Sequence, residues 1–273
     1  MQKWFKLVSI LLLSLMMVVA CSNNKGTDQG SGKEETKPAA ESQEKVELTI
    51  SAAASLKDAM DVIQHTYQED HPNVTLDFNF GASGSLQQQI SQGAPVDLFF
   101  SAAEDKFDLL VEEGLIAKED GVDLLGNSLV LVVPKGDQSI KGFEELATAG
   151  FDKISIGTPE TVPAGKYAKE SFEKMGIWKD VEPKVVYAKD VRQVLSYVET
   201  GNVGAGIVYK TDALTSDQVE IVATAKPDTH TPIIYPVGII KDSKHYEAAK
   251  EFYDYLLSDA ALKVFEEYGF TTK

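Results

Sequence analysis

From Val46 onwards the chain alternates short apolar segments of β type with amphipathic segments of helical period, and this alternation limits the possible folds more than any other feature. The segment over residues 56–69 illustrates the helical period, because its apolar residues recur on one face: Leu56, Ala59, Met60, Ile63 and Tyr67. Strands that alternate with helices form parallel sheets with helices on both faces. No internal repeat is visible, which argues against a solenoid. We therefore expect the α/β class.

The expected elements divide into two lobes. Strands are expected over residues 46–51, 74–80, 96–100, 129–133, 153–156, 184–187, 205–208 and 233–240. Helices are expected over residues 56–69, 86–91, 104–113, 164–175, 191–200, 245–257 and 259–268. Residues 46–128 and 129–232 each supply one alternating unit, and residues 233–273 are expected to return to the first. The prediction is a first lobe of residues 46–128 plus 233–273 and a second lobe of residues 129–232. Each lobe is a mostly parallel sheet flanked by helices.

The N-terminus has the pattern of an export signal. Lys3 and Lys6 precede an apolar run over residues 7–19, which is too short for an ordinary membrane-spanning helix. Cys21, the one cysteine, follows directly after VVA at residues 18–20, an arrangement similar to the bacterial lipobox, in which the cysteine is lipidated. Residues 21–45 are polar apart from a few small residues and are expected to form a flexible linker. We expect residues 1–20 to be a signal peptide and the protein to be lipid-anchored at the extracytoplasmic face of the cell membrane.

Charge and cysteine content exclude several classes of function. The chain has 26 basic and 42 acidic residues and a formal net charge of −16. A nucleic-acid partner is not expected, because phosphate backbones require a basic surface. A single cysteine excludes an internal disulfide and a cysteine-rich metal site. Arg192 is the only arginine, so a cluster of arginines around a phosphate or carboxylate is also excluded.

Small and hydroxyl-bearing residues follow several of the expected strands, and ligands of open α/β sheets bind beyond the carboxyl ends of strands. Ser55 follows the first strand and is expected to be an N-cap, with Asp58 completing a capping box. Ser83 and Ser85 follow the second strand. Pro163 and Asp190 are placed to begin two further helices, and Tyr209 ends a strand.

Helix N-termini that converge on one cleft form an anion site without a basic side chain. Each N-terminus exposes unpaired N–H groups and carries about half a positive charge. Local dipoles of this kind can bind an anion even in an acidic protein. The four strand-to-helix junctions and the terminal tyrosine therefore predict an anion site.

The same segments resemble the molybdate-binding component of bacterial ABC transporters, which belongs to the periplasmic-type solute-binding proteins. The resemblance runs from about residue 46 to the C-terminus and rests on the order and spacing of several motifs. They are AAASL at residues 52–56, GAPVDLF at 93–99, LGNSLV at 125–130, VPAGKYA at 162–168, ETGNVGAGIVY at 199–209, FYDYL at 252–256 and YGFT at 268–271.

This resemblance implies a two-lobed type II periplasmic-binding-protein fold that closes over one tetrahedral dianion, molybdate or tungstate. The implied ligand-binding residues are Ser55, Ser83, Ala164, Val191 and Tyr209. Hydroxyl groups would come from the serines and the tyrosine, and backbone N–H groups from Ala164 and Val191. The second serine is assigned as Ser83 by its position after Phe80, with Ser85 left open as the alternative.

The resemblance also implies how the protein works. A monomer would capture the anion, close about a hinge near residues 127–129 and 231–233, and deliver the anion to ABC transporter permease subunits. Neither a cofactor nor a free metal cation is expected.

Three other functions remain as alternatives. A hydrolase is disfavoured, because the GASGS segment at residues 81–85 departs from a nucleophile elbow in its last position, and no enzyme activity is expected. A metal-cation receptor is disfavoured, because His65, His71, His230 and His245 lack ligand spacing. A receptor for sulfate or another oxyanion on the same fold is poorly distinguished by the sequence.

Overall fold

A computed structural model describes residues 45–148 and 150–273 of the chain. The predicted signal peptide, Cys21 and the linker as far as residue 44 lie outside the described residues. The described part belongs to one compact unit, Gln43–Lys273. No helix among these residues is both long enough and apolar enough to cross a membrane.

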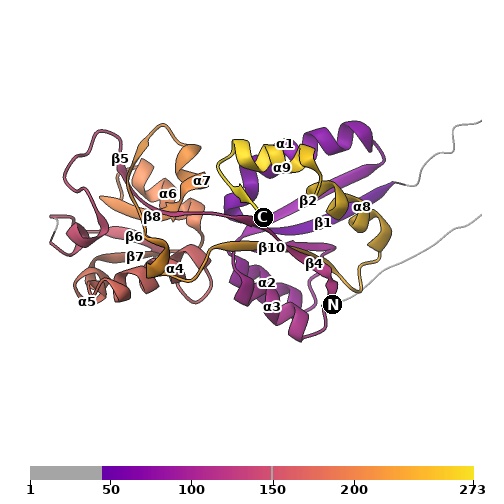
Figure 1. The fold of residues 1–273 in the computed structure, drawn as a ribbon, viewed down its shortest axis with the longest axis horizontal. Coiled ribbons are helices and arrows are strands. Elements are labelled where there is room, and N and C mark those ends of the chain that lie inside the picture. The colour runs from indigo at the N-terminus through magenta and orange to yellow at the C-terminus, as the bar shows by residue number, and fades with distance from the viewer. Residues whose placement is uncertain (1–44, 149) are drawn as a thin grey trace, which may run out of the picture. The chain divides into compact units, whose positions relative to one another are not determined.

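A six-stranded sheet has the order β11-β4-β10-β3-β1-β2. Its strands are β1 (Val46–Ala53), β2 (Val74–Gly81), β3 (Leu98–Phe100), β4 (Ile116–Gly126), β10 (Ile234–Ile240) and β11 (Thr271–Thr272). Strand β1 pairs in parallel with β2 and β3, whereas β10 runs antiparallel to β3 and β4. One face carries α1 (Lys57–Asp70), α8 (Tyr246–Leu256) and α9 (Asp259–Glu267), and the other carries α2 (Ser83–Ser91) and α3 (Glu104–Glu112) (Figure 1).

A five-stranded sheet has the order β7-β6-β8-β5-β9. Its strands are β5 (Leu129–Pro134), β6 (Ile154–Gly157), β7 (Val185–Ala188), β8 (Ala205–Tyr209) and β9 (Val219–Thr224). Helices α6 (Val191–Glu199) and α7 (Lys210–Leu214) pack on one face, and α4 (Pro163–Lys174) and α5 (Trp178–Val181) on the other (Figure 1). Short 3-10 helices complete the chain: η1 (Ala54–Leu56), η2 (Phe143–Ala147), η3 (Glu182–Lys184) and η4 (Pro227–Thr229).

The expected α/β class, with two sheets flanked by helices, is confirmed, but the sheets are mixed rather than mostly parallel. Strand β5 is antiparallel to both β8 and β9, and β11 is antiparallel to β4. Strands β5 and β10 each enter their sheet directly from the other sheet, β5 after residues 127–128 and β10 after residues 225–233, which contain η4. Neither strand is therefore placed by a helical crossover within its own sheet, the connection that parallel neighbours require.

Strand β4 was not expected from the sequence, and its position explains why. Along its middle it pairs with β10 on one side only, and it carries Lys118, Glu119, Asp120 and Asp123 there. Charged residues are tolerated at such an edge, and they hide the apolar alternation on which a sequence-based prediction depends. By contrast, β5 is a continuous apolar run whose residues from Leu129 to Val133 are fully buried.

The connections at residues 127–128 and 225–233 join the two sheets.

Candidate functional site

Segments that follow strands of both sheets meet at one small cavity. Its volume is about 10 Å³, far below the ~300–1,000 Å³ of pockets that hold drug-sized ligands. The residues around it are mostly small: Ala53, Ala54, Ser55, Gly81, Ala82, Ser83, Ala102, Val162, Pro163, Ala164, Val191 and Tyr209. All five residues predicted from the sequence are among them, and Ser85 is not. The cavity therefore accepts only a small guest.

Ser55 and Ser83 come from the six-stranded side. Ser55 was expected to be an N-cap, and this is wrong: β1 continues to Ala53, and Ser55 lies inside η1, with its hydroxyl 2.9 Å from the Tyr235 hydroxyl. Ser83 is the first residue of α2, and its Oγ accepts a hydrogen bond of 2.9 Å from the Ala102 N–H. Of the described side chains, none caps the N-terminus of η1 or α2. In α2 the Gly84 N–H donates to the Thr161 carbonyl at 3.0 Å, so the Ser83 N–H and the first N–H groups of η1 are left for other acceptors.

Ala164 and Val191 come from the five-stranded side. Pro163 begins α4, as expected, and has no N–H, so Ala164 is the first residue of α4 that can offer one. Asp190 caps α6, also as expected, but its carboxylate accepts from the Gln193 N–H at 2.8 Å. The Val191 N–H is therefore not taken up by the cap. Both helices thus begin at the cavity with a backbone donor available.

Tyr209 ends β8 and is 1% exposed. In the part of the chain that the structure describes, no partner of its hydroxyl has good hydrogen-bond geometry, and its polar neighbour is the Tyr235 hydroxyl. Burial, and then the neighbouring Tyr235, raise the pKa of Tyr209 well above its usual range, so the hydroxyl keeps its proton. A buried hydroxyl without a partner is costly unless a guest accepts its hydrogen bond.

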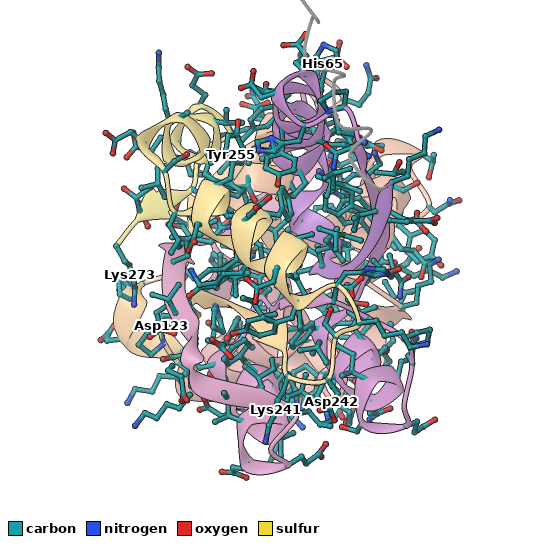
Figure 2. The ribbon with its side chains drawn as sticks, turned by 90° about the vertical axis from the view of Figure 1, so that its right-hand side faces the viewer. His65, Asp123, Lys241, Asp242, Tyr255 and Lys273 are labelled. Carbon is teal, nitrogen blue, oxygen red and sulfur yellow. The ribbon has the colours of Figure 1, made fainter. Side chains whose placement is uncertain are left out.

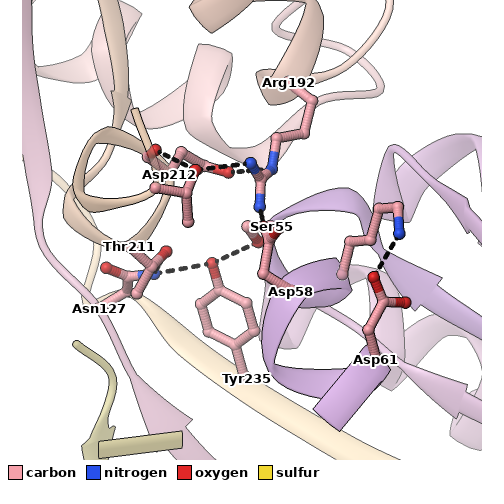
Figure 3. A network of polar contacts seen from close by, with 10 residues as sticks. Ser55, Asp58, Asp61, Asn127, Arg192, Thr211, Asp212 and Tyr235 are labelled. Atoms are coloured by element: carbon pink, nitrogen blue, oxygen red, sulfur yellow. Dashed lines mark hydrogen bonds and ion pairs between the residues drawn. The ribbon is translucent and has the colours of Figure 1, made fainter. Parts of the chain in front are cut away.

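The cavity is lined by no charged side chain of the described residues. Arg192 follows Val191, but its guanidinium contacts Asp58 from α1 and lies 2.8 Å from Asp212 (Figure 3). Burial raises the pKa of Asp212 to about 6, and the charge of Arg192 opposes this rise. Asp58 therefore pairs with Arg192 instead of completing the expected capping box. The groups that can attract an anion in the cavity are therefore helix N-termini and hydroxyl groups.

Three contributors were missed by the sequence reasoning. Ala102 follows β3, and the same rule that singled out the other strand-to-helix junctions would have found it. Tyr235 and Asn127 lie behind Ser55, in β10 and just after β4, and are joined to it by hydrogen bonds (Figure 3). No local signal marks Tyr235, which lies 180 positions from Ser55 in the chain. Asn127 lies in the LGNSLV motif and at the expected hinge, but neither feature indicates its hydrogen bond to Tyr235.

The described residues contain no group of three or more histidine, cysteine or acidic side chains that could hold a metal ion. His65 is exposed on α1, where it lies 3.5 Å from Glu69. Figure 2 shows His65 at the outer end of the molecule in that view. The histidines therefore give no support to a cation site.

Comparison with known proteins places this geometry in a family. The model of the bacterial extracellular solute-binding proteins matches residues 48–271. A Bacillus subtilis (strain 168) protein named "Putative ABC transporter substrate-binding lipoprotein YvgL" is 56% identical over 273 residues, covering 98% of this chain and 100% of its own. The molybdate-binding protein ModA of Escherichia coli (strain K12) is 39% identical over 233 residues, covering 83% of this chain and 89% of its own.

A solved structure agrees with these relatives. The "substrate binding domain of putative molybdenum ABC transporter from Clostridium difficile" is 46% identical, with a TM-score of 0.65, and covers 84% of this chain and 99% of its own. The family is one of solute-binding proteins, and these relatives are named as binding proteins of ABC transporters and not as enzymes, in agreement with the expectation from the sequence. The chain belongs to the bacterial extracellular solute-binding protein family, as a substrate-binding protein of the ABC transporter type.

Proposed function

We propose that this protein is the molybdate receptor of an ABC importer and that it also binds tungstate. The oxyanion occupies the cavity formed by Ser55, Ser83, Ala164, Val191 and Tyr209. Lipid on Cys21 anchors the protein at the extracytoplasmic face of the membrane, and the loaded monomer delivers the anion to the permease subunits.

One observation carries the proposal: a very small cavity at which hydrogen-bond donors converge from both sheets without a charged side chain. Molybdate and tungstate carry no proton at neutral pH, so a site made of donors alone suits them. Each hydrogen bond to a charged oxygen contributes roughly 1.5–3 kcal/mol. Several such bonds offset the costs of association and of closing the cleft, so we expect a submicromolar dissociation constant.

The relatives support the choice of ligand. The Escherichia coli relative is named for molybdate, and the solved relative is named for molybdenum transport. The site residues of this chain lie together at one cavity, which a shared ligand requires. Sulfate is also free of protons at neutral pH, so it is the competing ligand that the donors do not reject by chemistry alone.

Titration calorimetry of the full chain in detergent, against molybdate, tungstate, sulfate and phosphate in turn, tests the proposal. We expect tight binding of molybdate and tungstate, at least about 100-fold weaker binding of sulfate, and weaker binding still of phosphate. Sulfate binding tighter than molybdate binding would show a sulfate receptor. Absence of binding to all four anions would reject an oxyanion site at this cavity.

A further inference from the structure

We infer that Asn127 and Tyr235 are positioning residues that fix the direction of the Ser55 hydroxyl, so that Ser55 can only donate a hydrogen bond into the cavity. Tyr235 is fully buried, and neither residue lines the cavity. They act through a chain of hydrogen bonds that ends at Ser55 (Figure 3). The inference rests on the proposed function, because an oxyanion is the acceptor that the fixed hydroxyl meets.

Asn127 sets the donor-to-acceptor direction of this series of hydrogen bonds. The Ser128 backbone N–H, which can only donate, lies 2.8 Å from one atom of the Asn127 amide, so that atom is Oδ1. The amide nitrogen must then face the other way. It donates to the Tyr235 hydroxyl at 3.1 Å and to the Thr211 hydroxyl at 2.9 Å. Asn127 is therefore a donor toward Tyr235.

Tyr235 passes this direction on to Ser55. Its oxygen accepts from Asn127, and its own proton would be buried without an acceptor unless it points to Ser55 Oγ, 2.9 Å away. Ser55 Oγ then accepts from Tyr235, which leaves the Ser55 proton for the cavity. The Tyr235 ring is held in place by edge contacts to Tyr209 and Phe270, with centroids 5.7 and 5.4 Å away.

Ser83 has the same arrangement by a different route. Its Oγ accepts from the Ala102 N–H at 2.9 Å, so its proton is also left for the cavity. The two serines therefore both have an acceptor position filled by the protein and a proton facing the guest. A site built in this way favours an anion that accepts on every oxygen and disfavours one that must donate a proton.

A double-mutant cycle tests the inference with molybdate as the probe. Ser55→Ala is expected to weaken binding about 5- to 150-fold, and Tyr235→Phe about 5- to 10-fold. If Tyr235 acts through Ser55, Tyr235→Phe in the Ser55→Ala background changes the affinity less than about 2-fold. Equal effects of Tyr235→Phe in both backgrounds, or no effect in the wild type, would overturn the inference. Tyr67→Phe, which removes another buried tyrosine hydroxyl, is the matched control and should bind as the wild type does.

A substitution that reverses the direction of these hydrogen bonds gives a second test. Asn127→Asp places an acceptor where Asn127 donates, so Tyr235 would turn its proton toward the new carboxylate and draw the Ser55 proton away from the cavity. We expect Asn127→Asp to bind at least about 10-fold more weakly than Asn127→Ala. Most of this difference should disappear in the Tyr235→Phe background, where only the added charge remains. If the affinity difference between Asn127→Asp and Asn127→Ala is the same in the Tyr235→Phe background, the effect is due to charge alone. That result would contradict the proposed series of hydrogen bonds.

An error in the proposed ligand would be recognised by a different experimental outcome. A wild-type protein that binds sulfate and not molybdate rejects the molybdate assignment, and the same cycles measured with sulfate then decide whether the chain acts on Ser55. Melting of the ligand-free variants, followed by circular dichroism, confirms that each is folded before its affinity is interpreted.

Discussion

Gly84 lies where the two sides of the cleft touch, and a single methyl group there should block closure without harming the fold. Its N–H donates to the Thr161 carbonyl at 3.0 Å, and a Cβ added to Gly84 would lie 2.8 Å from that oxygen and 2.9 Å from Thr161 Cα. Both atoms belong to backbone, which cannot rotate away. Overpacking costs about 1–3 kcal/mol, and the lost hydrogen bond costs about 0.5–1.5 kcal/mol. Gly84→Ala should therefore weaken molybdate binding roughly 10- to 2,000-fold.

Without ligand, Gly84→Ala should not lower the stability of the protein, in contrast to its effect on molybdate binding. If the cleft opens, Thr161 moves away from Gly84, and an alanine in α2 favours the helix by up to about 1 kcal/mol. The melting temperature without ligand should then stay the same or rise by a few degrees. Calorimetry gives the affinity and differential scanning calorimetry the stability, with Ser85→Ala in the same helix as control. Wild-type affinity in Gly84→Ala would refute the reasoning, and so would an equal loss of stability in the ligand-free state.

Three further predictions concern separate parts of the molecule. Ser55→Ala and Tyr209→Phe should each weaken molybdate binding by about 1–3 kcal/mol with the fold intact, and calorimetry showing no change would remove that residue from the site. Burial raises the pKa of Asp212 from 3.8 to about 6, so its contribution to stability is present below about pH 4 and is lost as the pH rises through 6. The free energy of unfolding of the wild type relative to Asp212→Asn, from urea titrations, should therefore fall by on the order of 3 kcal/mol across this window; a constant difference would contradict the assignment. Cys21→Ser should release the protein from the membrane fraction, and a variant that stays membrane-bound would argue against the lipid anchor.

The strand-to-helix junctions at the cavity could be predicted from local rules, whereas the five individual residues were implied by the family resemblance. A proline marks the start of α4 and an aspartate cap marks the start of α6, which places Ala164 and Val191 at those two N-termini. Parallel strands bring such junctions to one edge of a sheet. The one junction left out, at Ala102, obeys the same rule.

The remaining features depend on contacts between distant segments. Ser55 has the sequence of a cap, yet β1 is extended to Ala53 by its pairing with β2, so the serine enters the helix and its hydroxyl turns to Tyr235. Asp58 likewise has the spacing of a capping box, but Arg192 from the other sheet takes its carboxylate. In both cases a partner far along the chain competes with the local motif, and only the folded structure decides which prevails.

Arg192 shows why the site has to work through dipoles. It is the only arginine in the sequence and directly follows Val191, so it is the cation best placed to face a bound anion. Instead its guanidinium is held by Asp58 and Asp212, and these three groups together carry a formal charge of −1. An anion in the cavity therefore gains no net formal positive charge from Arg192 and its partners. Exposed charges are screened beyond about 8 Å at physiological salt, whereas N–H groups in direct contact with the anion are not. A strongly acidic surface and a dianion in the interior are therefore compatible in one molecule.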